Sequence, residues 1–165
     1  MDTGTATRTK PERLVKARRM SHGTLMCADR RKTRRFYEEF LGLETVIHSK
    51  NSMMVGLSTD FHVVCVSVRP EKLADMHVFH HWGIDVDTRA EVDAAFQRAN
   101  ELKDTYGIKK IMKPVEQHRV YSFYLQDLDN NWWEIQHTER HHDEYFARGD
   151  QFDLPADDSQ SKPRE

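Results

Sequence analysis

The sequence lacks a long apolar run, an excess of charge of one sign and abundant cysteine. No apolar run approaches the roughly 20 residues that span a membrane, and no signal-peptide pattern is present, so we expect a cytoplasmic protein with no membrane partner. The formal net charge of −2 gives no electrostatic reason to expect nucleic acid as a partner. Only two cysteines occur, Cys27 and Cys65, and in a reducing cytoplasm we expect both to be free thiols.

The residues that are present predict one soluble folded domain. The chain has 165 residues, 38% of them hydrophobic and 32% charged, which is enough for a real core. Residues 1–19 predict a flexible basic arm, residues 20–148 the folded domain, and residues 149–165 a disordered tail. Ten histidines are more than packing usually needs in a chain of this size, and histidine is the commonest metal ligand, so a metal site is a hypothesis to test.

The strongest organisational signal is an internal repeat. Module one, residues 20–70, begins with an alternating strand at 21–28. Asp29 is suited to cap the helix that follows, and Gly42 to end it. Three strand-like runs complete the module, which gives the order βαβββ.

The same order then restarts about 59 residues later, in module two, residues 77–148. A strand at 81–86 opens this module. The elements predicted after it are a helix that begins with a Thr88–Glu91 capping box, a short strand at 108–113 and a hairpin at 121–136. The fold class is therefore α+β, with two βαβββ modules.

Matching positions in the two modules carry metal-ligand residue types. His22 opens the first module and His81 the second, each on the strand face opposite the aliphatic residues. Glu134, in the final strand, has the same polar-face parity. Two histidines and a carboxylate from three strands can hold one side of an octahedral divalent metal and leave open positions. His80 is a rival ligand, but its parity groups it with the apolar face.

The hairpin at 121–136 has one apolar and one polar face. Phe123 and Leu125 lie on the apolar face, whereas Tyr124 and Glu134 lie on the polar one. If the polar face looks into bulk water, this is an ordinary half-solvated antiparallel sheet. If it looks into a cavity, its polar side chains belong to a site.

Three stretches carry a resemblance to a known superfamily: H-G-T-L-M-C-A-D with R-R-F-Y-E-E-F-L-G-L in 22–43, H-W-G-I-D-V-D in 81–87, and F-Y-L-Q-D-L-D-N-N-W-W-E in 123–134. Over residues 20–137 the chain resembles the vicinal oxygen chelate superfamily, which includes glyoxalase I, extradiol dioxygenases, fosfomycin-resistance transferases and bleomycin-binding proteins. The resemblance implies two βαβββ modules forming a curled mixed sheet around a metal-binding cavity, in a homodimer. It also implies the metal ligands His22, His81 and Glu134.

Within the superfamily, the chain most resembles the small single-domain extradiol ring-cleavage dioxygenases. Tyr124 matches their active-site tyrosine, and His118 lies close to their second catalytic histidine. Two features depart from that pattern: the gap from His118 to Phe123 is shorter, and the turn lacks its usual Pro and Gly. The resemblance implies Fe(II), dioxygen and a catechol-like small-molecule substrate, with Tyr124 contacting a substrate hydroxyl and His118 moving a proton. The substrate-binding residues expected are Thr24, His62, Asp85, Trp132 and Gln136.

Two alternatives stay open. The same three ligands with Zn, Ni or Mn would suit a glyoxalase-like isomerase or lyase, or a thiol transferase. Glyoxalases usually have a further carboxylate ligand in the last strand of the first module, and residues 61–68 offer none, which favours the three-ligand enzymes. A metal-free drug-binding resistance protein is the third hypothesis, and the complete set of three ligands argues against it.

Overall fold

The computed structural model divides the chain into two compact units, Met1–Ala74 and Asp75–Glu165, and each is described by itself. The structure describes residues 14–57, 61–117, 119–139 and 143–148. The predicted tail and most of the predicted N-terminal arm therefore lie outside the described residues. In the part of the chain that is described, no helix is long and apolar enough to cross a membrane.

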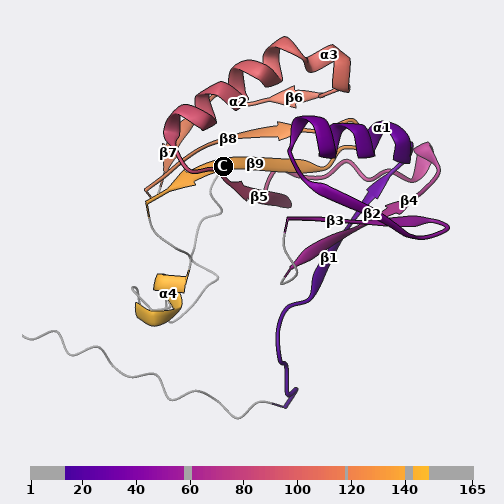
Figure 1. Ribbon diagram of the computed structural model, residues 1–165, viewed down its shortest axis with the longest axis horizontal. Helices are drawn as coiled ribbons and strands as arrows, with labels where there is room; N and C mark the ends of the chain where they lie inside the picture. Colours follow the sequence, from indigo (N-terminus) through magenta and orange to yellow (C-terminus); the bar gives the residue numbers. More distant parts are fainter. Residues whose placement is uncertain (1–13, 58–60, 118, 140–142, 149–165) are drawn as a thin grey trace, which may run out of the picture. The chain divides into compact units, whose positions relative to one another are not determined.

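The first unit is a four-stranded mixed sheet with helix α1 beside it (Figure 1). In space its strands follow the order β1-β4-β3-β2, with β1 parallel to β4 and the other neighbours antiparallel. Along the chain the elements are β1 (His22–Cys27), α1 (Arg30–Arg35), η1 (Phe36–Phe40), β2 (Glu44–Ser49), β3 (Ser52–Gly56), β4 (His62–Ser67) and η2 (Pro70–Lys72).

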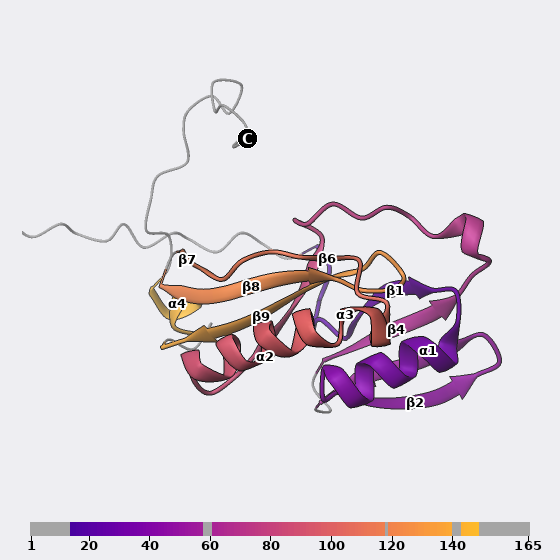
Figure 2. The same ribbon diagram turned by 90° about the horizontal axis from the view of Figure 1, so that it is seen from above.

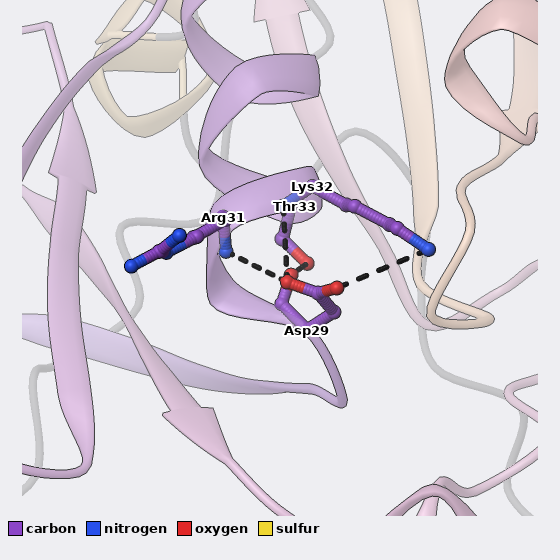
Figure 3. Close-up of polar contacts among 4 residues, drawn as sticks. All are labelled: Asp29, Arg31, Lys32 and Thr33. Atoms are coloured by element: carbon purple, nitrogen blue, oxygen red, sulfur yellow. Dashed lines mark hydrogen bonds and ion pairs between the residues drawn. The ribbon is translucent and has the colours of Figure 1, made fainter.

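Asp29 starts the helical segment of this unit, as its residue type predicts. Its carboxylate accepts hydrogen bonds from the backbone N–H groups of Arg31 and Lys32, which have no partner within the helix (Figure 3). Its backbone carbonyl accepts from Thr33 Oγ1 at 2.9 Å. The turn beyond Arg35 widens into the π-helix η1, and Gly42 follows with a φ of 69°, a conformation that glycine adopts without strain.

The core of the first unit is formed by residues of η1 and of the sheet. Phe36 and Tyr37 of η1 are fully buried, as are Met53 of β3 and Cys65 of β4. Cys27 of β1 is also fully buried, and the two cysteines, both within the described residues, form no disulfide. The aliphatic side of each strand therefore faces inward, which leaves His22 and Thr24 on the other side of β1, where both are exposed.

The second unit repeats the arrangement around a longer helix. Its strands follow the order β5-β9-β8-β6, with β5 parallel to β9 and β7 paired to β8. Its elements are β5 (His81–Asp85), α2 (Arg89–Glu101), α3 (Lys103–Tyr106), β6 (Lys110–Ile111), β7 (Val115–Gln117), β8 (Val120–Gln126), β9 (Trp132–Thr138) and α4 (Asp143–Arg148). The predicted fold class, α+β built from two modules, is confirmed, and the strands form a mixed sheet in each module.

Helix α2 lies along β8 and β9 (Figure 2). The predicted capping box is present at its start, since Thr88 Oγ1 accepts from the Glu91 N–H and Glu91 accepts from the Thr88 N–H. Along the helix Val92 and Ala99 are fully buried. The Phe96 ring meets the Phe123 ring edge-on, with centroids 5.5 Å apart, which packs the helix against the apolar face of the hairpin.

The strand predicted at 108–113 is shorter than expected. The strand itself is limited to Lys110 and Ile111, which pair with β8, and before it the Ile108 N–H bonds the carbonyl of Lys103, the first residue of α3. A second short strand, β7, follows it and was not predicted. All three residues of β7 are exposed, so no alternation of buried and exposed residues marks it in the sequence.

Candidate metal centre

His81 is held in one tautomer by the backbone that precedes it. Its Nδ1 lies 2.7 Å from the carbonyl oxygen of Val78, which can only accept, so Nδ1 donates. In a neutral imidazole this leaves the lone pair on Nε2. The loop before β5 therefore aims an electron-pair donor away from Val78, as second-shell hydrogen bonds do for metal-ligating histidines.

Glu134 meets that lone pair from the adjacent strand. Its Oε2 lies 3.1 Å from His81 Nε2, and the side chain is only 12% exposed. Strand register brings the two together, because β5 and β9 are parallel neighbours and Gly83, two residues after His81, pairs with Glu134. The second carboxylate oxygen, Oε1, accepts a buried hydrogen bond of 2.7 Å from Ser122 Oγ.

Tyr124 completes this cluster from β8. It lies directly across from Glu134 in the antiparallel register, and its ring meets the His81 ring edge-on with centroids 5.0 Å apart. Burial, together with the hydrogen bond to Glu134, raises the pKa of Tyr124 to about 12. The phenol therefore keeps its proton at neutral pH and acts as a hydrogen-bond donor.

The polar face of the hairpin is thus not the solvated side of an ordinary sheet. Taken as whole residues, Ser122, Gln126, Trp132, Glu134 and Gln136 are all less than a tenth exposed. Burial of a carboxylate and several amides requires compensating partners. This burial excludes the half-solvated sheet, and the assignment of these side chains to a site stays a prediction.

The pair fits a divalent cation. Because Nδ1 donates to Val78, His81 Nε2 and Glu134 Oε2 are both electron-pair donors. Two such atoms repel each other at 3.1 Å unless a proton or a cation binds between them. Neighbouring ligands of an octahedral ion, each at about 2.1 Å, lie about 3 Å apart, which matches this separation. Imidazole together with carboxylate is also a usual donor set for transition metals.

The third predicted ligand, His22, belongs to the first unit. There its ring stacks on the ring of His62, with centroids 5.7 Å apart, because the two residues pair in the β1–β4 register. Its Nδ1 lies 2.8 Å from Ser21 Oγ. Among the described residues, no group of three or more His, Cys, Asp or Glu side chains is arranged to hold a metal. The second unit alone thus offers two ligands.

Strand register also locates the position in the first unit that corresponds to Glu134. Glu134 pairs with the residue two positions after His81, and in the first unit the residue two positions after His22 is Thr24. Thr24 pairs with Val64, so Val64 holds the equivalent position. An aliphatic side chain there cannot ligate a metal, which agrees with the lack of a carboxylate noted in this strand.

Three of the remaining predicted site residues already have hydrogen-bond partners. Gln136 Nε2 donates to Asp85 Oδ1 at 2.6 Å, so these two pair with each other across β9 and β5. Trp132 Nε1 donates to the carbonyl of Met76 at 2.7 Å, so the indole ties the loop before β5 to the hairpin. His118 lies outside the described residues.

A cavity lies elsewhere in the second unit. It has a volume of about 240 Å³, and none of the predicted site residues lines it. Its lining residues are Arg89, Glu116, Arg119, His137 and Glu139. Arg89 and Glu116 already form an ion pair of 2.7 Å, with each side chain about half exposed. This exposed pair supplies little energy and leaves less charge for a ligand.

Two groups of the cluster were missed in the sequence. Ser122 has the same strand parity as Tyr124, and the register of the hairpin puts it close to Glu134. That parity could have identified it. The Val78 carbonyl has no such signal, because only the path of the loop before β5 brings it to His81.

Comparisons with known proteins agree with this architecture. No curated protein matches the chain. A lactoylglutathione lyase from Agrobacterium tumefaciens is similar in structure, with 18% identity over 74% of this chain and 96% of that one, at a TM-score of 0.54. The fosfomycin resistance protein FosX from Mesorhizobium loti is 21% identical over 78% of this chain and 98% of that one, at a TM-score of 0.54. FosX from Listeria monocytogenes, complexed with Mn(II) and sulfate, is 19% identical over 80% of this chain and 98% of that one, at a TM-score of 0.60.

At these identities the solved structures show a shared fold. The family match is more direct, since it covers residues 19–135, more than half of the chain. It includes both βαβββ units as far as β9, and with them His22, His81 and Glu134. The chain belongs to the Glyoxalase/Bleomycin resistance protein/Dioxygenase superfamily.

Proposed function

We propose that the protein is a metal-dependent enzyme that binds a small substrate through two neighbouring oxygen atoms and catalyses an isomerisation, a lyase reaction or a thiol addition. The observation that carries this proposal is the pair of His81 Nε2 and Glu134 Oε2, 3.1 Å apart, with the histidine tautomer fixed by Val78. These two residues, with His22, would hold Mn(II), Zn(II), Ni(II) or Fe(II). The chemistry that such a cation supplies is Lewis-acid polarisation of a substrate oxygen.

The protein's own groups would then bind and orient the substrate. Tyr124 lies against both members of the pair and keeps its proton, so it would donate a hydrogen bond to a substrate oxygen. Thr24 and His62 would contribute from the first unit. Asp85 and Gln136, which fix one another, would present a rigid polar wall, and Trp132 an apolar one.

A second candidate is an Fe(II) extradiol dioxygenase that cleaves a catechol-like ring with dioxygen. Two observations favour it. Tyr124 lies ten residues before Glu134 and directly across from it, as the resemblance to these enzymes implies. Val64 replaces the carboxylate that a four-ligand glyoxalase would carry. The names of the similar structures, a lyase and two fosfomycin resistance proteins, make the first candidate the leading one.

The first experiment is to measure metal identity and stoichiometry on protein purified without oxygen. About one Mn, Zn or Ni per chain would support the leading proposal and lead to assays of lactoylglutathione turnover and of fosfomycin modification. About one iron, together with oxygen uptake on catechols, would favour the second candidate. No metal, even after Mn(II) and Fe(II) are added, would refute both and leave a metal-free binding protein. Sedimentation of the same sample tests the homodimer that the resemblance implies.

A further inference from the structure

Ser122 makes a short, buried hydrogen bond with the Glu134 carboxylate. Its Oγ donates to Oε1 at 2.7 Å, and both residues are less than a tenth exposed. The hydrogen bond therefore forms where water competes little, and such bonds to a carboxylate are stronger than neutral ones. It joins β8 to β9 and fixes the rotation of the carboxylate about its last bond.

The two oxygens of the Glu134 carboxylate therefore have different partners. Oε1 is occupied by Ser122, whereas Oε2 is the oxygen that faces His81 Nε2 at 3.1 Å. We propose that Ser122 is a positioning residue that makes Glu134 a one-oxygen ligand. This inference rests on the proposed function, because it concerns how that metal site is kept open.

The count of coordination positions shows why this matters. An octahedral ion has six coordination positions, so three single-atom ligands leave three of them free. A carboxylate that binds through both oxygens takes a fourth position and leaves two. A substrate that binds through two oxygens would then fill the site and leave no position for a further reactant. By holding Oε1, Ser122 would preserve the third open position.

The test is Ser122→Ala, read by the effect of bound Mn(II) on water proton relaxation, which reports how many water molecules exchange on the ion. Mn(II) binding is followed in the same samples, so that parent and variant are compared when both are saturated. We expect Ser122→Ala to lower the water relaxivity of the bound ion by about one third, from three waters to two. Loss of a merely structural hydrogen bond would not change this count.

The matched control is Ser52→Ala. Ser52 is also a buried strand serine, 8% exposed, but its Oγ bonds Ser49 Oγ in the first unit. Its removal should leave the relaxivity as in the parent. If Ser122→Ala does not fold, Ser122→Cys replaces it, because a thiol keeps nearly the same volume but is a weak donor. The same loss of one third is expected.

Unchanged relaxivity in the folded Ser122 variant would overturn the inference while leaving the proposed function standing. An equal loss in Ser52→Ala would overturn it as well, since the effect would not be specific to the Glu134 contact. A parent protein that binds no Mn(II) would refute the positioning role together with the Mn(II) site on which it rests. Mn(II) binding by the parent therefore tests the metal site, whereas the relaxivity of the variants tests the inference about Ser122.

Discussion

His81 Nε2 and Glu134 Oε2 face each other at 3.1 Å across two parallel strands, and the other nitrogen of the same imidazole is committed to the carbonyl of Val78. The two facing atoms are thus both presented as electron-pair donors. Nothing in this arrangement depends on the first unit, so it can be tested with substitutions in the second unit alone.

We expect His81→Ala to weaken metal binding at least about 100-fold while the fold is kept. Loss of a second-shell partner already costs about 10–100-fold, and loss of a ligand should cost no less. Binding of Mn(II) is measured by calorimetry, with circular dichroism to confirm folding. His80→Ala is the control, because His80 is adjacent but exposed. Equal binding by the parent and His81→Ala would remove His81 from the ligand set.

Tyr124→Phe should bind metal like the parent but turn over substrate about 100-fold more slowly, the usual scale for loss of a group that donates to reacting oxygen. The phenyl ring keeps the edge contact with His81, and only the hydroxyl is lost. Steady-state kinetics, with the substrate found in the activity screen, measure the effect. Tyr121→Phe is the matched control, because the Tyr121 hydroxyl bonds Asp93 instead. Similar rates for both variants would exclude the Tyr124 hydroxyl from the mechanism.

The buried carboxylate of Asp127 should make stability fall as pH rises. Burial raises the pKa of Asp127 from 3.8 to about 6, although the Trp133 indole and other donors oppose the shift. Between these values the folded state keeps a proton that the unfolded state releases. The contribution of Asp127 to the free energy of unfolding is therefore fully present below pH 4 and is lost as pH rises through 6. At 1.36 kcal/mol per pKa unit, the loss amounts to about 3 kcal/mol.

Urea unfolding of the parent and of Asp127→Asn at pH 4.5 and pH 7.5 measures this slope. Asparagine cannot titrate, so its other effects on the turn give a constant difference, and only the change of that difference with pH is diagnostic. The parent should lose stability relative to Asp127→Asn as pH rises. Asp104→Asn, at an exposed helix position, is the control and should give no such change. An opposite slope would show that the hydrogen bonds outweigh burial.

Asp29→Ala should lower the free energy of unfolding by about 1 kcal/mol, because two N–H groups at the start of α1 lose their acceptor (Figure 3). Asp29→Asn keeps a side-chain oxygen and should stay close to the parent. The ion pair with Lys32, 3.9 Å long and exposed, should contribute little to the difference. Denaturant unfolding measures both variants, and equal losses in both would point to charge instead of capping.

The sequence alone determined the order of elements and the faces of the strands. Alternation along β1, β5, β8 and β9 put His22, His81, Tyr124 and Glu134 on polar faces, and capping residues marked where α1 and α2 begin. These are local properties, because side-chain parity and caps depend on residues a few positions apart. The repeat of the whole pattern was enough to predict two βαβββ modules.

Tertiary structure decided which polar groups meet. The hydrogen bonds from Ser122 to Glu134 and from His81 to Val78 depend on register and on the path of a loop, and neither is encoded by a spacing in the chain. The same holds for the pairing of Val64 with Thr24, which identifies the aliphatic counterpart of Glu134. Parity says which way a side chain points, whereas atomic contacts across strands are fixed only when the sheet assembles, because register and loop path set those distances.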